Sequence, residues 1–129
     1  MPQVNIVTKC FSTEDPVKVE GAVLNLFPKS QVEHEGDEIT ASTTDLGRFK
    51  ELIRNHRILD STRKVLLRGL MGDTTMFALN KQAAYAGKVS FLEEKVALGG
   101  IEVTIEAEGL EAIIDEIAPV TIDGEEVPR

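Results

Sequence analysis

The sequence predicts an α+β fold of two layers, in which a mainly antiparallel sheet carries helices on one of its faces. Two observations predict this class. Residues 31 to 35 and 38 to 43 flank Gly36-Asp37, a pair that is typical of the two-residue turn of a hairpin. Segments with helical periodicity are scattered among the strands, which favours helices packed on one side of an antiparallel sheet.

The chain begins with a strand and a helix. Residues 3 to 10 alternate polar with apolar side chains, which predicts a first strand. Asp15 is a capping carboxylate, and Pro16 stands at the first helical position. Apolar residues then recur at the i, i+3, i+4 and i+7 spacing of one helical stripe until Pro28 ends the helix. The hairpin follows.

Two helices come after the hairpin. Asp45 is placed to cap the first of them, whose buried stripe includes Phe49 and Ile53. A bend near Arg57 leads into a further helix at about residues 58 to 70.

The last third supplies two more strands and two more helices. Residues 74 to 79 have strand composition, and Asn80 caps a short helix that ends at Gly87. Residues 101 to 108 alternate most regularly, with one apolar and one acidic face. Residues 110 to 117 form a final amphipathic helix.

Length and composition indicate a single soluble domain. We expect a chain of 129 residues to form one α+β domain over residues 1 to 123, followed by an acidic, frayed tail at 124 to 129. Cys10 is the only cysteine, so an internal disulfide is impossible, as is usual in a reducing cytoplasm. The first residues do not resemble a signal peptide, and no apolar stretch approaches the ~20 residues of a membrane span. We therefore expect a cytoplasmic protein without a membrane partner.

The positive charge of this acidic chain is concentrated in one segment. The sequence has a net charge of −8, yet residues 48 to 88 hold nine of its fourteen Lys and Arg and only three acids. This segment carries a net charge of +6, whereas the remainder carries −14. The distribution predicts a cationic face on an acidic body, and such a face is the usual electrostatic footprint of a nucleic-acid partner.

Helical geometry narrows the basic segment to a stripe. On the helix at 58 to 70, Lys64 and Arg68 cluster opposite the apolar arc together with Arg57, within roughly 60° of one another. Lys50 and Arg54 share the exposed side of the preceding helix. If the two helices are neighbours, these five cations converge on one surface.

Two interpretations of the stripe stay open. Amphipathic helices need a solvated face, and Lys and Arg are good helix formers, so solubility alone explains exposed cations. However, Asp60 is the only acid between Glu51 and Asp73, so local ion pairs account for only part of the charge. The remaining cations of the stripe must pair with acids elsewhere in the fold, bind an external anion or be solvated by water. At physiological salt, charges more than about 8 Å apart are largely screened from each other, so acids on the far side of the domain do not prevent a phosphate from binding at the stripe.

The sheet itself is a poor candidate for contacting RNA. Glu102 and Glu106 lie on the polar face of a predicted strand, where they repel a phosphate backbone. The chain has five Phe, one Tyr and no Trp, so a sheet that stacks bases is not expected. We expect any contact with RNA to come from helices and loops.

Three runs between Arg57 and Ile105 carry a resemblance to a known family: RILDSTRKVLLRGL, TTMFALNKQAAYAGKVSF and LGGIEVTI. They resemble the uncharacterised archaeal family of predicted RNA-binding, exosome-linked proteins, over most of the chain to about Asp123. The most specific segment is LNKQAAYAGKVSF. The resemblance implies a fold similar to a large-subunit ribosomal protein and to double-stranded-RNA-binding domains, and it implies an RNA partner. It implies no catalytic residue.

A second candidate contact lies at the start of the short helix. Asn80-Lys81-Gln82 offers two amides and an ammonium where backbone N–H groups favour anions, and Lys88 is expected close by. Alternatively, Asn80 only caps the helix and Gln82 is only solvated. The predicted RNA-binding residues are Arg54, Arg57, Lys64, Arg68, Asn80, Lys81, Gln82 and Lys88.

Motifs for catalysis are not found in the sequence. His34 and His56 are predicted to be packing residues, and with one cysteine they form no zinc-binding spacing. Cys10 is predicted to be a small core residue. We therefore predict a non-catalytic protein without metal or cofactor that binds structured RNA. The alternative is a protein-interaction module, such as a homo-oligomer or a module with an acidic protein partner.

Overall fold

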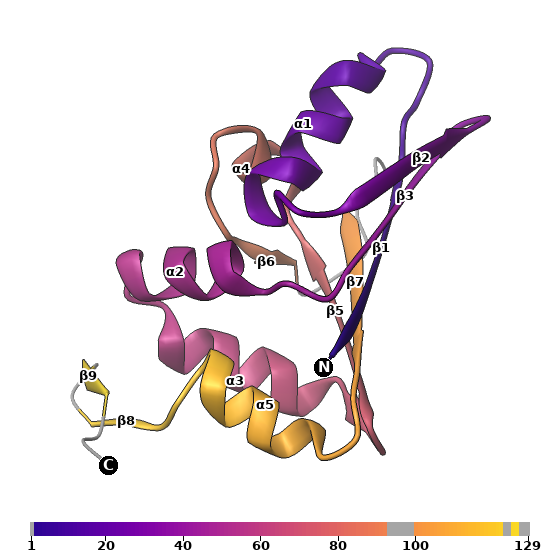
Figure 1. The fold of residues 1–129 in the computed structure, drawn as a ribbon. Coiled ribbons are helices and arrows are strands. Elements are labelled where there is room, and N and C mark those ends of the chain that lie inside the picture. Colours follow the sequence, from indigo (N-terminus) through magenta and orange to yellow (C-terminus); the bar gives the residue numbers. More distant parts are fainter. Residues whose placement is uncertain (1, 93–99, 123–124, 127–129) are drawn as a thin grey trace.

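The computed structural model describes residues 2–92, 100–122 and 125–126, which form a sheet with helices on one side (Figure 1). The elements are β1 (Gln3–Lys9), α1 (Pro16–Leu26), β2 (Gln31–Glu35), β3 (Glu38–Thr43), α2 (Gly47–Asn55), α3 (Leu59–Arg68), β4 (Leu70–Met71), β5 (Thr74–Leu79), α4 (Lys81–Tyr85), β6 (Phe91–Leu92), β7 (Ile101–Glu106), α5 (Leu110–Ile117), β8 (Thr121–Ile122) and β9 (Glu125–Glu126). Within this described part, no helix has the length and apolar character needed to cross a membrane.

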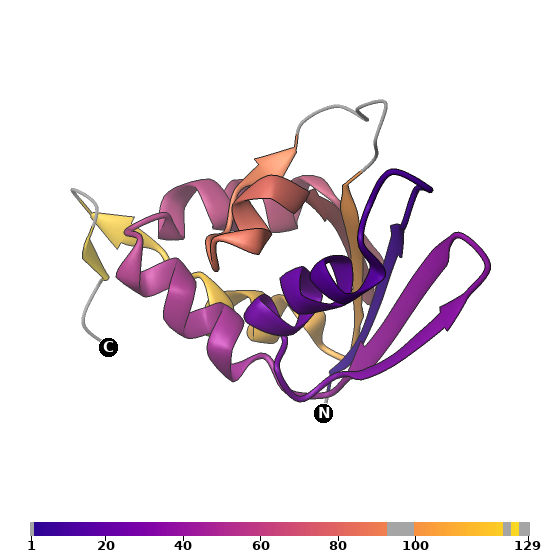
Figure 2. The ribbon, with the colours of Figure 1, turned by 90° about the horizontal axis from the view of Figure 1, so that it is seen from above.

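The main sheet confirms the predicted α+β class. Its strands lie in the order β2-β3-β1-β7-β5-β4, with β6 paired to β5, and every pair is antiparallel. Along β1, β3, β5 and β7, alternate side chains are buried. Figure 2 shows the helices gathered against one face, while the β2–β3 hairpin extends away from them. None of the helices in the described part of the chain covers the other face of the sheet.

A row of aromatic rings joins the two layers. Phe49 of α2 is fully buried and stacks on Phe27, with ring centroids 5.3 Å apart, and on Phe77 of β5, at 5.8 Å. Phe91 of β6 meets Phe77 edge-on at 5.7 Å. Offset and edge-on pairs of this kind are favourable beyond the area that they bury. This row fixes α2 and β6 relative to the centre of the sheet.

The longer predicted elements are confirmed, and the differences lie in short segments. Asp15 caps α1 as predicted, by accepting from the N–H of Val17 at 2.9 Å. Asp45 accepts from the N–H of Gly47 at 2.8 Å, but the capping position of α2 is Leu46, one residue later than predicted. The helix predicted to reach residue 70 ends at Arg68 because the chain there enters β4. β4, β6, β8 and β9 were not predicted. They contain two residues each, too few for a periodic pattern.

A small second sheet lies near the end of the chain. Thr121–Ile122 and Glu125–Glu126 pair antiparallel as β8 and β9, and the second of these strands falls within the predicted acidic tail at 124 to 129. The other tail positions, 124 and 127 to 129, lie outside the described residues.

Arg57 forms the turn between α2 and α3. The N–H of Arg57 bonds to the carbonyl of Arg54 at 3.1 Å, and the N–H of Ile58 bonds to that of Ile53 at 3.1 Å. This pair of bonds is a Schellman motif, in which the residue at the turn adopts a left-handed conformation. Arg57 has a φ of 55° and is the one described residue other than glycine with positive φ. Glycine is the usual residue at such a position.

Two contacts hold the end of α3 against the sheet. The buried hydroxyl of Thr75 donates to the carbonyl of Leu66 at 2.7 Å, which satisfies an acceptor near the helix C-terminus. Gly69 follows the helix directly, and a Cβ atom at this position would lie 2.1 Å from the carbonyl oxygen of Met76. The close approach of α3 to β5 therefore requires glycine at residue 69.

The predicted packing role of the two histidines is wrong. His34 lies on the outer strand β2 and is exposed, although Ile39, which is paired with it in β3, is buried against Val19 of α1. His56 is also exposed, at the C-terminal cap of α2. Cys10, in contrast, is buried as predicted.

Candidate nucleic-acid interface

Two cations of α2, Lys50 and Arg54, contact α5. Lys50 Nζ lies 2.7 Å from Glu116 Oε1, and Arg54 Nη2 donates to the main-chain carbonyl of Glu116 at 3.1 Å. The two α2 cations of the expected five-cation surface are therefore both engaged with Glu116 of α5. The predicted RNA-binding residue Arg54 is engaged within the fold, in fixing the end of α5.

A third cation is also held by α5. Arg63 Nη1 lies 2.7 Å from Asp115 Oδ1 and donates to the carbonyl of Ala118 at 3.1 Å. These bonds tie α3 to the C-terminal end of α5. The acids that pair with Lys50 and Arg63 thus lie 66 and 52 residues further along the chain.

Three cations along α3 stay exposed. Arg57 precedes the helix, and Lys64 and Arg68 lie one turn apart on it. Among residues 2–92 and 100–122, none of the three has a carboxylate within ion-pairing distance. These residues are the part of the predicted stripe that the fold leaves available to an external anion.

A groove runs beside this part of α3. It has a volume of about 360 Å³ and lies between α3 and the segment at residues 89–91. Its lining combines apolar, hydroxyl and cationic side chains: Ile58, Val65, Val89 and Phe91, then Ser61 and Ser90, then Lys64 and Arg68. Both cations belong to the α3 wall, so charge and apolar surface meet in one concavity.

Main-chain bonds hold the opposite wall of the groove. The N–H of Asn80 donates to the carbonyl of Ser90 at 2.7 Å, and the N–H of Lys88 donates to that of Ala83 at 2.9 Å. Phe91 then pairs with Leu79 in the β5–β6 ladder. Sequence patterns did not predict this wall, because β6 has only two residues and comes to face α3 only in the folded protein. The segment KVSF, within the most specific part of the family resemblance, was the available signal.

The segment at residues 80 to 88 divides into buried and exposed positions. Asn80 caps α4 by accepting from the N–H of Ala83 at 2.9 Å. This capping role is the alternative to the RNA contact predicted for Asn80. Gln82 and Lys88 are exposed, and Lys88 directly precedes the groove residue Val89. Of this segment, Lys88 is the cation placed nearest to the groove along the chain.

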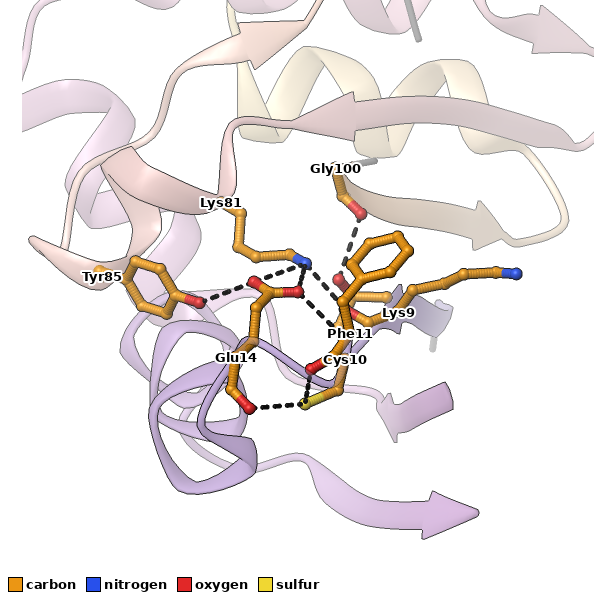
Figure 3. Close-up of polar contacts among 8 residues, drawn as sticks. Lys9, Cys10, Phe11, Glu14, Lys81, Tyr85 and Gly100 are labelled. Atoms are coloured by element: carbon orange, nitrogen blue, oxygen red, sulfur yellow. Dashed lines mark hydrogen bonds and ion pairs between the residues drawn. The ribbon is translucent and has the colours of Figure 1, made fainter. Parts of the chain in front are cut away.

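Lys81 is buried, which removes the support for its predicted contact with RNA. Its side chain is only 5% exposed, and its ammonium donates to Glu14 at 3.1 and 3.2 Å and to the carbonyl of Lys9 at 2.7 Å (Figure 3). The ring of Phe11 lies 5.6 Å from the same nitrogen. Lys81 therefore ties α4 to the connection between β1 and α1, and its ammonium is not presented to solvent.

The carboxylate of Glu14 organises this cluster. Burial alone raises the pKa of Glu14, but the N–H of Phe11 and the ammonium of Lys81 outweigh it, so the pKa lies below its ordinary value of 4.5. The hydroxyl of Tyr85 donates to Glu14 at 3.3 Å. Burial and then the charge of Glu14 raise the pKa values of the Tyr85 hydroxyl and the Cys10 thiol. Cys10 and Tyr85 are thus kept in their neutral forms.

The face of the sheet without helices is acidic, as the sequence suggested for β7. Exposed glutamates lie along β2, β3 and β7: Glu33, Glu35, Glu38, Glu102 and Glu106. Between them lie Asn5, Thr40 and Thr104. This surface repels phosphate, so the exposed cations along α3 remain the candidate interface.

No group of three or more His, Cys, Asp or Glu that could hold a metal ion is found among the described residues. Among the described residues, the groups with clearly shifted pKa values lie in the Glu14 cluster and at Asp45, whose pKa is lowered by the N–H of Gly47 and by Lys29. None of them lines the groove. The side chains that line the groove offer cations, hydroxyls and apolar contacts.

Comparison with known proteins identifies the family. A family model described as RNA binding matches residues 3–107. A UPF0201 protein of Methanocaldococcus jannaschii is 42% identical over 95% of this chain and 75% of its own, and one of Methanothermobacter thermautotrophicus is 38% identical over 92% of both. The crystal structure of a UPF0201 protein from Methanococcus jannaschii superposes with a TM-score of 0.89 at 40% identity, covering 98% of this chain and 99% of that one. The chain therefore belongs to the UPF0201 family.

Proposed function

We propose that this protein binds RNA, without catalysing a reaction, through the cations along α3 and the groove beside them. One observation carries the proposal: Arg57, Lys64 and Arg68 stay exposed without a carboxylate partner in the described part of a chain that has 22 acids and 14 bases. Phosphate groups neutralise cations of this kind and release counterions as they bind. The description of the matching family model, RNA binding, supports the same partner.

The placement of the acids is compatible with this proposal. The exposed glutamates of β2, β3 and β7 lie on the side of the sheet that faces away from the helices, whereas the three cations lie in the helical layer, where Asp60 is the exposed acid on α3. At physiological salt, charges separated by more than about 8 Å are largely screened from each other. A phosphate at α3 therefore responds mainly to the local cations and little to the net charge of −8.

The backbone at Arg57 gives independent support. A residue other than glycine in the left-handed region costs about 1–2 kcal/mol, and the turn into α3 has no evident need for a long side chain. Strained backbone positions tend to cluster where a side chain serves function. A cation at the one such position among the described residues is consistent with selection for binding and not for stability.

Fluorescence anisotropy with a structured RNA tests the proposal. The protein is expected to bind at about 50 mM salt, with a log–log salt slope of roughly −2 to −3 for three phosphate contacts. Changing Arg57, Lys64 and Arg68 together to Glu is expected to abolish most of the affinity and of the slope.

The matched control for this test is the triple change of Lys9, Lys18 and Lys29 to Glu. These lysines are exposed on other elements, and the control alters net charge by the same amount. It is expected to retain most of the affinity. Equal losses in the two triple variants, or no RNA binding by the natural protein at 50 mM salt, contradict the proposal.

Arg57→Gly separates binding from folding. Glycine relieves the left-handed strain, so the free energy of unfolding is expected to stay the same or to rise by up to about 1 kcal/mol. The lost phosphate contact is expected to reduce the salt slope of RNA binding by about 1. Urea unfolding and anisotropy on the same preparation measure both effects. A variant that is less stable, or that binds RNA with unchanged affinity and slope, argues against this role of Arg57.

A protein-interaction module is the second candidate, because the acidic sheet face and the cations of α3 are complementary surfaces on one chain. Two copies joined in this way form a head-to-tail contact. Light scattering over a range of concentrations tests self-association, and a constant monomer mass removes it. The link to the exosome that the family resemblance implies belongs to this class of interaction and stays a prediction.

A further inference from the structure

We infer that the groove beside α3 takes one unpaired nucleotide, with its base against the apolar lining and its phosphate at Lys64 and Arg68. The inference rests on the proposed RNA-binding function and specifies the form of RNA. Apolar surface contributed by Val65, Val89 and Phe91 is unnecessary for holding phosphate alone. A ligand that uses the whole groove must therefore have a flat apolar part joined to an anion.

The volume of the groove selects between RNA forms. About 360 Å³ lies near the lower end of the ~300–1,000 Å³ range of sites that enclose small ligands. A groove of this size accommodates a single base with its sugar, whereas a paired helix can only rest on the rim. Bases become available to such sites where RNA is single-stranded, in loops, bulges and ends.

The distribution of charge sets the orientation of the nucleotide. Lys64 and Arg68 both stand on the α3 wall, and the facing wall contributes Val89, Ser90 and Phe91. One phosphate backbone therefore runs along α3, and its base turns toward the wall at residues 89–91. The hydroxyls of Ser61 and Ser90 are the side-chain groups in the groove that can hydrogen-bond to base edges or to a 2′-OH without a charge.

The aromatic row supports the facing wall as a rigid surface. Phe91 meets Phe77 edge-on at 5.7 Å, and Phe77 stacks on the buried Phe49 at 5.8 Å. Phe91 itself is only partly buried, so part of its ring borders the groove. An aromatic side chain held in place from behind is the type of surface on which unpaired bases stack.

Three RNA probes test the inference by anisotropy at about 50 mM salt: an unstructured single strand, a blunt duplex of equal length, and the single strand with abasic positions. The single strand is expected to bind roughly fivefold or more tightly than either other probe, because each lost base contact costs at least that factor. Equal affinity for all three overturns the inference but leaves RNA binding intact. No binding of any probe overturns both proposals.

A variant that fills the groove provides a second, independent test of nucleotide binding in the groove. Ser90→Leu adds apolar bulk at an exposed lining position without changing charge or supplying a ring. It is expected to weaken binding of the single strand roughly fivefold or more, with an unchanged melting temperature. Ser12→Leu, at an exposed serine in the β1–α1 connection, is the matched control and is expected to bind as the natural protein does. Equal affinity of both variants for the single strand contradicts the inference.

Discussion

Replacing Phe49 by alanine is expected to lower the free energy of unfolding by about 3–5 kcal/mol, because the deletion leaves a cavity between the two layers. Phe49 is fully buried and contacts Phe27 and Phe77 through stacked rings. The change removes both pairs together with the area that the ring buries. Urea unfolding followed by circular dichroism measures the loss.

Two further substitutions provide reference values for the free-energy cost of Phe49→Ala. Phe49→Leu retains most of the volume and is expected to cost less than Phe49→Ala. Val17→Ala, at a position 74% exposed on α1, is expected to change stability by no more than about 0.5 kcal/mol. A cost for Phe49→Ala as small as that of Val17→Ala means that the rings do not fix α2 to the sheet.

Lys81→Met is expected to cost about 3–5 kcal/mol, since removal of one partner leaves the other charge buried and unpaired. Glu14 is only 12% exposed, and its carboxylate loses the ammonium at 3.1 Å. Methionine keeps the apolar stem of lysine, so the loss in free energy of unfolding measures mainly the removal of the ammonium charge. The double change Glu14→Gln with Lys81→Met is expected to cost less than Lys81→Met alone, because it leaves no unpaired carboxylate.

The dependence on pH provides the control for this ion pair. The pKa of Glu14 is lowered in the folded protein, so its contribution to stability is complete above the unfolded value near 4.5 and is lost as the pH falls through the lowered folded value. The difference in stability between the natural protein and Lys81→Met should therefore shrink below about pH 4.5. A difference that is constant from pH 7 to pH 3 means that the cost comes from packing and not from the ion pair.

The longer elements of this fold were predictable because each has a period and a boundary residue. Asp15-Pro16 begins α1, Gly36-Asp37 turns the hairpin, and strict alternation marks β7. The two-residue strands have no such period, and they exist because a neighbouring strand pairs with them. The sequence therefore predicted the layers and missed the segments that are defined by tertiary pairing alone.

The candidate site was predictable only in part, for a related reason. Helical spacing placed Lys64 and Arg68 on an exposed face, but it had no information on which cations meet acids from distant segments. Arg54 meets Glu116 and Lys81 meets Glu14, more than 60 residues away in each case. The wall opposite α3 depends likewise on a tertiary contact. What the sequence established was the charge of the surface, and the structure identified which charges stay available.

The aromatic row also makes this protein suited to fluorine NMR. Four of its five phenylalanines lie along one row from Phe27 to Phe91, and the fifth, Phe11, lies 5.6 Å from the Lys81 ammonium. Incorporation of fluorophenylalanine thus places reporters in the layer interface, at the groove and beside the buried ion pair. A ligand that occupies the groove should shift the Phe91 resonance most and the Phe11 resonance least, so a single spectrum locates the site.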